Sequence, residues 1–245
     1  MIKKVLVGFN CSRHSRNQSS EEFIDDAGDP TIRSEDSRPQ NAFARHQDGL
    51  KRITEEGNTD TSLRGRLLAR VQKVLETDEQ FIPAGDLDEV LTGQAIKMEL
   101  QSQGLGDVSK YVFRHAQRIF AILLVIRKLD ALKDLIEESL GDEVLPIAVS
   151  VDGLPKDKKL QSAFSEWDLD TRKQFADFQW TLLAPVFSEG MHLKLHDDAR
   201  LPFIRTEPIA NGAYGGVHSV EIHCNHSSFM KFESPMSTEV SLKYQ

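Results

Sequence analysis

The sequence predicts an α+β protein that is mainly helical and ends in a small antiparallel β region. Three observations predict this class: a polar leader over residues 1–61, helical spacing of apolar residues over 62–189, and alternation of apolar and polar residues within 190–245. Apolar side chains recur about every 3.6 residues on one face of a helix and about every 2 on one face of a strand. We therefore expect a leader, a helical domain and a terminal β region.

The leader begins with a short apolar run at the N-terminus. From Asn10 to about Asp60 it is rich in Ser, Asn, Asp, Glu, Arg and Gln, and it has hardly any periodic apolar face. Such a segment cannot bury enough apolar surface to offset the entropy lost on ordering. We expect it to be disordered.

The helical domain begins where apolar residues first recur at helical spacing, at Leu67, Val71, Val74 and Leu75. The other segments predicted to be helical are a short one from Asp86, residues 94–103, residues 108–140 and residues 170–183. The run over 108–140 is long enough for two helices, which would meet near residues 128–130. Pro185 is expected to stop the last helix.

The terminal region changes to strand spacing. Met191, Leu193 and Leu195 alternate with polar residues, and further strands are predicted over 203–209, 217–222 and 240–244. Between two of these strands lie three glycines within five residues. They are Gly212, Gly215 and Gly216.

Charge and cysteine usage restrict the classes of partner. The chain has 38 acidic and 30 basic residues and a net charge of -8, which argues against binding to nucleic acid or to an anionic membrane. Cys11 and Cys224 are far apart and form no CxxC pair, which fits a reducing intracellular compartment, cytoplasmic or nuclear.

The most apolar run, Ile119 to Ile126, is far shorter than the roughly 20 residues that span a bilayer. It predicts a buried helix.

The glycine-rich stretch allows two interpretations. Glycine lets the backbone turn with positive φ and lets a phosphate approach closely, so the stretch could be a nucleotide clamp or a plain tight turn. A clamp on a hairpin needs a first strand, glycines at the turn, an apolar residue on the returning strand and a lysine on the next strand. The chain contains these four parts in this order. They are residues 203–209, residues 211–216, Val217 and Lys243.

These residues resemble the opening of a protein kinase. Residues 212–217, Gly-Ala-Tyr-Gly-Gly-Val, fit the end of the G-x-G-x-x-G-x-V pattern, and residues 240–243, Val-Ser-Leu-Lys, are similar to V-A-I-K. The family's first glycine falls on Ala210. Four short segments before the glycine turn look like the helical leader of a group of serine/threonine kinases from filamentous fungi. Their sequences are FAILLVI, DEVLP, FQWTLLAPVF and LPF. The resemblance covers roughly residues 62–245.

The resemblance implies that residues 190–245 form the first three strands of a kinase nucleotide-binding lobe, which binds ATP with Mg²⁺. The residues implied to contact the nucleotide are Ala210, Gly212, Tyr214 and Gly215 over the phosphates, Val217 against adenine and Lys243 on the phosphates. The chain contains no His-Arg-Asp and no Asp-Phe-Gly segment. Because phosphoryl transfer needs the base and metal ligands of these segments, we expect a truncated, inactive kinase-like fragment with weak or absent ATP binding.

The alternative function belongs to a different class. In it, the chain is a non-catalytic helical protein-interaction module, the helices between Ser62 and Leu183 carry the surface for an unknown protein partner, and the terminal hairpin is only structural.

Two histidine-rich segments contain potential metal ligands. His218, His223, Cys224 and His226 are potential zinc ligands, and strand alternation would place all except His223 on one face. Ligands on a single strand splay apart, however, so we assign no metal to them. His192 and His196 are expected on the wet side of an edge strand and are given no role.

Overall fold

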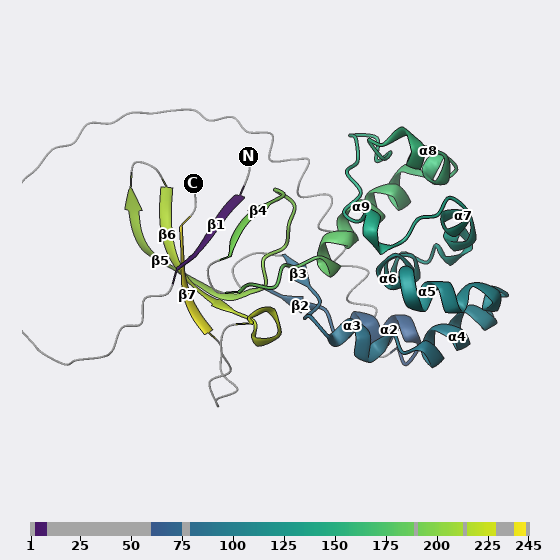
Figure 1. Cartoon of the computed structure of the whole chain (residues 1–245), viewed down its shortest axis with the longest axis horizontal. Helices are drawn as coiled ribbons and strands as arrows, with labels where there is room; N and C mark the ends of the chain where they lie inside the picture. The colour runs from purple at the N-terminus through teal and green to yellow at the C-terminus, as the bar shows by residue number, and fades with distance from the viewer. Residues whose placement is uncertain are drawn as a thin grey trace, which may run out of the picture.

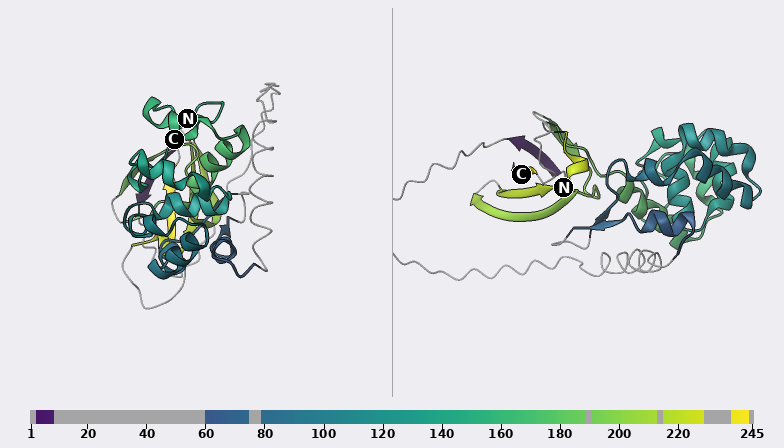
Figure 2. Two further views of the ribbon diagram at one scale, coloured as in Figure 1. Left: turned by 90° about the vertical axis from the view of Figure 1, so that its right-hand side faces the viewer. Right: turned by 90° about the horizontal axis from the view of Figure 1, so that it is seen from below.

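The structure is a computed structural model that describes residues 3–8, 60–74, 79–188, 191–212, 215–228 and 238–243. A helical unit and an antiparallel sheet lie next to each other, joined through the short strands β2 and β3 and the segment that follows α9 (Figures 1 and 2). This arrangement agrees with the predicted α+β class.

The helical unit occupies residues 60–188. Its α-helices are α2 (Leu63–Leu68), α3 (Asp86–Val90), α4 (Gly93–Ser102), α5 (Ser109–His115), α6 (Gln117–Val125), α7 (Leu132–Glu137), α8 (Lys158–Ser165) and α9 (Leu169–Leu182). Short 3-10 turns are η2 (Gly106–Val108), η3 (Leu129–Ala131) and η4 (Asp142–Val144). Side-chain caps begin several helices: Ser62 accepts from the N–H of Gly65, and Asp168 accepts from that of Thr171.

The core of this unit is centred on α6. Every residue from Ile119 to Val125 is buried, and α6 packs against α2, α5 and α9. The apolar run therefore forms a buried helix, as predicted. The rings of Phe164 on α8, Phe175 on α9 and Trp167 between these helices contact one another within the core.

Some predicted helices have other bounds. The segment 108–140 is divided twice, because the backbone leaves helical geometry at Ala116 (φ -143°) and again at Arg127, whose φ is 60°. The first predicted helix ends at Leu68, and the chain then forms β2 (Gln72–Lys73), which pairs antiparallel with β3 (Gln80–Phe81). The structure also contains α8, which the sequence spacing did not predict.

The main sheet has the strand order β4-β1-β7-β6-β5, and all its pairings are antiparallel. Its strands are β1 (Lys3–Gly8), β4 (His192–Leu195), β5 (Phe203–Gly212), β6 (Gly215–Ile222) and β7 (Thr238–Lys243). A second, smaller apolar cluster packs here, with Phe187, Leu201, Phe203, Val220 and Ile222 buried.

Strand β1 changes the predicted organisation of the chain. Residues 1–61 were predicted to form a polar leader, but Lys3–Gly8 pairs with β4 on one side and with β7 on the other. The N-terminal apolar run thus belongs to the sheet because its backbone N–H and C=O groups find partners there. Residues 9–59, the rest of the predicted leader, lie outside the described residues.

Candidate functional site

The glycine-rich stretch is the tip of the β5–β6 hairpin. In the pairing of these strands, Gly212 is opposite Gly215, Asn211 is opposite Gly216, and Ala210 is opposite Val217. Only residues 213 and 214 connect the two strands, so the hairpin has a two-residue loop, a connection that favours residues able to adopt positive φ. Tyr214, one of the predicted phosphate contacts, lies outside the described residues.

Three of the predicted nucleotide contacts lie at one level of the sheet. Val217 is the register partner of Ala210 on one side and of Lys243 on the other. The same row continues through Leu6 of β1 to His192 of β4, so it crosses all five strands. The Gly212–Gly215 pair lies two residues further toward the tip, or about 7 Å along the strands. The fold thus brings the glycine turn and Lys243 close to each other.

The outer strand of the hairpin, β5, is irregular at the same level. Its register with β6 shifts between Pro208 and Ala210, which is the mark of a β-bulge at Ile209. Because β5 is an edge strand, Pro208 needs no ladder partner for its missing N–H. The bulge and the proline protect this edge from pairing with another strand.

The histidine-rich segment after β6 is not the continuous strand that its predicted alternation required. Strand β6 ends at Ile222, and residues Cys224–His226 form the 3-10 turn η5. Cys224 is exposed, whereas His226 is 1% exposed and lies with its ring edge against Phe81, 5.3 Å between ring centroids. Among the described residues no group of three or more His, Cys, Asp and Glu could hold a metal ion.

His226 instead contacts the helical unit. Its Nε2 accepts a hydrogen bond from the N–H of Ala84 at 3.0 Å, and its Nδ1 lies 2.9 Å from the carbonyl oxygen of Pro185. Burial lowers the pKa of His226, and the neighbouring His223 contributes to the lowering. Burial also lowers the pKa of His223, against the attraction of the Asp86 carboxylate.

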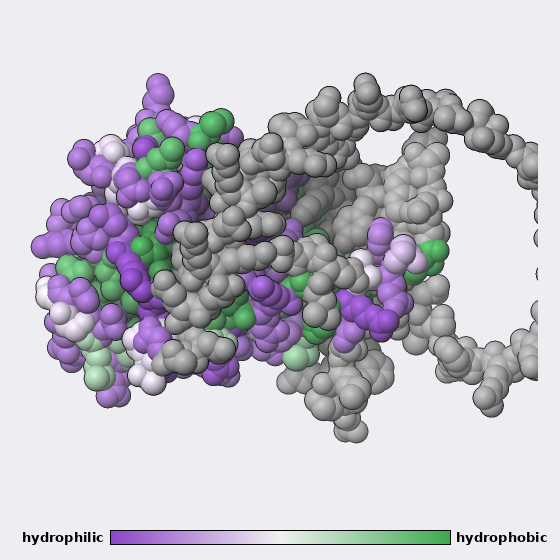
Figure 3. All heavy atoms as spheres, turned by 180° about the vertical axis from the view of Figure 1, so that it is seen from behind, coloured by the Kyte–Doolittle hydropathy of each residue, from purple (hydrophilic) through white to green (hydrophobic). Residues whose placement is uncertain are grey.

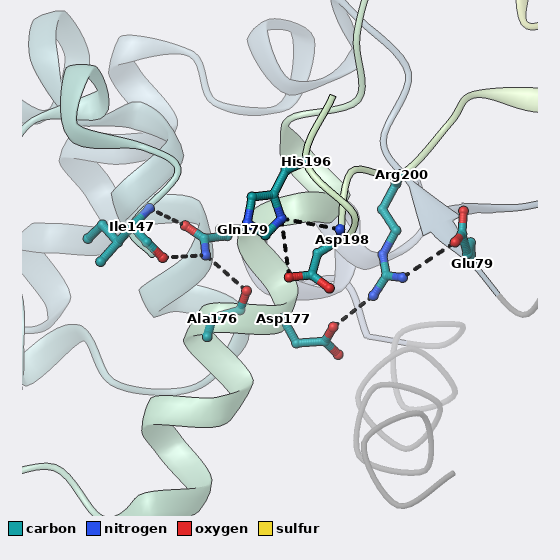
Figure 4. Close-up of polar contacts among 8 residues, drawn as sticks. All are labelled: Glu79, Ile147, Ala176, Asp177, Gln179, His196, Asp198 and Arg200. Atoms are coloured by element: carbon teal, nitrogen blue, oxygen red, sulfur yellow. Dashed lines mark hydrogen bonds and ion pairs between the residues drawn. The ribbon is translucent and has the colours of Figure 1, made fainter. Parts of the chain in front are cut away.

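A charged cluster joins the two units on another side (Figure 4). The guanidinium of Arg200, from the segment between β4 and β5, lies 2.7 Å from Asp177 on α9 and 3.8 Å from Glu79, just before β3. Nearby, the ring of His196 stacks on Trp180 with 4.8 Å between ring centroids, and its Nδ1 accepts from the N–H of Asp198. His196 follows the edge strand β4, as expected, but it has a packing role.

Sequence reasoning missed Arg200 and misread His226. Neither residue belongs to a local motif, because their partners Asp177, Glu79, Ala84 and Pro185 lie in distant segments. The neighbours of His226 in the sequence, Asn225 and Ser227, are polar and gave no signal that the imidazole is buried.

No helix in the described part of the chain is long and apolar enough to cross a bilayer. Comparison of the chain with protein-family models, curated proteins and solved structures finds no match.

Proposed function

We propose that the sheet is a kinase-type nucleotide-binding element that binds ATP with Mg²⁺ weakly, and that these 245 residues do not transfer phosphate. The observation that carries the proposal is the register of three strands, in which Ala210, Val217 and Lys243 share one row. The paired glycines Gly212 and Gly215 lie just beyond this row. A glycine turn, an apolar residue and a lysine in this order are the parts that a phosphate clamp requires.

Each part has a physical role in the proposed site. At Gly212 and Gly215 no Cβ stands between a phosphate and the backbone N–H groups, which can donate hydrogen bonds to phosphate oxygens. The ammonium group of a lysine adds a positive charge for the same oxygens. An apolar residue at position 217 provides one wall for adenine.

The proposed binding is weak because kinases enclose adenine between two lobes. The residues that resemble a kinase here supply one wall, and apolar burial contributes only about 25 cal/mol per Å². Losing the second wall should move the dissociation constant to about the millimolar range or above. Without His-Arg-Asp and Asp-Phe-Gly segments, the base and metal ligands for phosphoryl transfer are also missing from this sequence.

Titration of the ¹⁵N-labelled chain with Mg²⁺–ATP tests the proposal. We expect amide shifts concentrated at Gly212, Gly215 and Gly216, with a midpoint near or above about 1 mM. Lys243→Ala should abolish them, whereas Lys194→Ala on β4 is the matched control and should not. Absence of hairpin shifts at about 10 mM ATP, or equal shifts in the Lys243→Ala variant, would contradict the proposal.

A second candidate is the helical interaction module. It is favoured by two exposed apolar side chains on helices that pack together, Met98 on α4 (63% exposed) and Phe113 on α5 (46% exposed). Elsewhere the surface of the helical unit seen in Figure 3 is mostly hydrophilic, with hydrophobic residues in small groups. The DNA beyond codon 245 separates the two candidates: an open frame with His-Arg-Asp and Asp-Phe-Gly supports the kinase-type element, and its absence favours the interaction module.

A further inference from the structure

His226 lies at a point where three distant segments meet. It belongs to the η5 turn that directly follows β6, while its hydrogen-bond partner Ala84 precedes α3 and its partner Pro185 follows α9. The backbone of the same residue is also engaged, because the His226 carbonyl accepts from the N–H of Phe187 at 2.8 Å. One residue therefore joins the end of the glycine-bearing hairpin to the segments that precede α3 and follow α9.

The two ring hydrogen bonds define the protonation state of His226. The carbonyl oxygen of Pro185 can only accept, so Nδ1 must carry a proton and donate it. The N–H of Ala84 can only donate, so Nε2 must be unprotonated. Only the neutral imidazole with its proton on Nδ1 satisfies both partners, and a second proton on Nε2 would point at another N–H donor.

The surroundings of His226 disfavour the cation chiefly because the ring is buried. The ring is buried against Phe81, and the ring of His223 is 6.1 Å away between centroids. On α3 the nearest carboxylate is that of Asp86, which is already 3.4 Å from the guanidinium of Arg70. Asp86 also accepts from Asn225 at 3.4 Å, and Arg70 is shared with Glu89. Burial therefore outweighs the backbone contacts of Pro185 and Ile82 and the attraction of Asp86, and the pKa of His226 is lowered.

We propose that His226 is a pH-sensitive latch, whose neutral imidazole holds the end of β6 against the helical unit and whose protonation on Nε2 releases this contact. The latch acts whether or not the hairpin binds a nucleotide, because its partners Ala84 and Pro185 belong to the helical unit and not to the proposed clamp.

The direction of the pH effect follows from proton linkage. When the contact is open, the imidazole is solvated and has its ordinary pKa of about 6.5, whereas the closed contact has a lower pKa. Above about pH 6.5 both states are neutral and the latch has its full strength. As the pH falls below that value the open state binds the proton first, so the open-to-closed ratio rises by up to about tenfold per pH unit. The rise stops below the lowered pKa of the closed state.

The first test uses the intact wild-type chain. Long-range ¹H–¹⁵N NMR of the histidine rings should show His226 neutral at pH 7, with its proton on Nδ1, and still neutral somewhat below the ordinary histidine pKa of about 6.5. A protonated His226 at pH 7, or a neutral ring with its proton on Nε2, would overturn the proposal. This readout needs no variant and therefore does not depend on the folding of one.

The second test measures opening of the contact. Protection factors of the Ala84 and Phe187 amides, each corrected for the intrinsic exchange rate at each pH, should fall between pH 7.5 and pH 5.5, by up to about tenfold at the lower value. His226→Gln, whose amide oxygen can accept from Ala84 without titrating, should remove this pH dependence. His196→Gln, which replaces a histidine on another side of the contact between the two units, is the control and should keep it. Equal pH dependence in wild type and His226→Gln would overturn the latch.

Discussion

The side chain of Gln179 pairs with the backbone of Ile147 as a neighbouring strand would. Its Oε1 accepts from the N–H of Ile147 at 2.8 Å, and its Nε2 donates to the carbonyl of the same residue at 3.0 Å (Figure 4). The same Nε2 group also donates to the carbonyl of Ala176. Gln179 is 1% exposed, so one buried amide fixes the segment after η4 to helix α9.

Replacing Gln179 by alanine should lower the free energy of unfolding by at least about 2 kcal/mol. The variant leaves the buried N–H and C=O groups of Ile147 without their partner, and each such group costs roughly 1–3 kcal/mol. Urea unfolding followed by circular dichroism measures the loss. Gln94→Ala, which removes an exposed glutamine from α4, is the control and should change stability by less than about 0.5 kcal/mol. A comparable loss in both variants would show that the pairing with Ile147 is unimportant.

Helix α6 is capped by a residue distant in sequence. Its N-cap position is Ala116, which has no side-chain acceptor, and the carboxylate of Asp142 instead accepts from the N–H groups of Arg118 (2.9 Å) and Ile119 (3.0 Å). Because these donors have no partner within the helix, Asp142→Ala should cost about 1–2 kcal/mol. Asp142→Asn keeps an acceptor oxygen and should give an intermediate loss.

Thermal unfolding of the two Asp142 variants measures this effect. Asp107→Ala, which removes an exposed carboxylate in η2, is the control and should leave the unfolding temperature nearly unchanged. If Asp142→Asn were as destabilised as Asp142→Ala, the carboxylate charge, and not its acceptor geometry, would be the main contribution to the cap.

Local spacing predicted elements whose stability depends on their own residues. The buried helix over Ile119–Val125 is one, since a continuous apolar run needs a surrounding core wherever the chain places it. The division of residues 108–140 was not predictable in the same way. Helix α5 ends before Ala116, and the next helix, α6, is capped by Asp142. A contact between residues so far apart in the sequence does not affect the local spacing of apolar residues.

For the candidate site, too, local spacing predicted single elements but not the contacts between distant segments. The β5–β6 hairpin followed from two alternating runs around glycines, and a third strand containing Lys243, predicted over 240–244, also followed from alternation. The position of β1 beside that third strand did not, because it depends on pairing between opposite ends of the sequence. His226 was misread because strand alternation was extended past Ile222, where the chain turns into η5.

Arg200 is expected to stabilise the junction between the units through charge. Its side chain is 16% exposed and its guanidinium faces two carboxylates, so Arg200→Ala leaves Asp177 and Glu79 with like charges and a reduced supply of donors. We expect a loss of about 1–3 kcal/mol. Arg205→Ala, which breaks the exposed pair with Glu207, is the matched control and should cost less than about 1 kcal/mol. Equal losses, measured by urea unfolding at one ionic strength, would contradict a special role for Arg200.

The last prediction concerns β1, whose removal should divide the sheet. Strand β4 reaches the other strands only through β1, and Leu6 is the register partner of both His192 and Lys243. Proline at position 6 removes a backbone donor and disturbs the pleat, so Leu6→Pro should expose the amides of β4 and β7 to hydrogen exchange.

Leu6→Val keeps the donor and favours a strand, so it should retain protection. Amides of α6 are the internal reference, because α6 packs against α2, α5 and α9. Since β7 carries Lys243, Leu6→Pro should also weaken the amide shifts that Mg²⁺–ATP produces at the hairpin. Unchanged protection of residues 192–195 and 238–243 in Leu6→Pro would show that the sheet does not depend on β1.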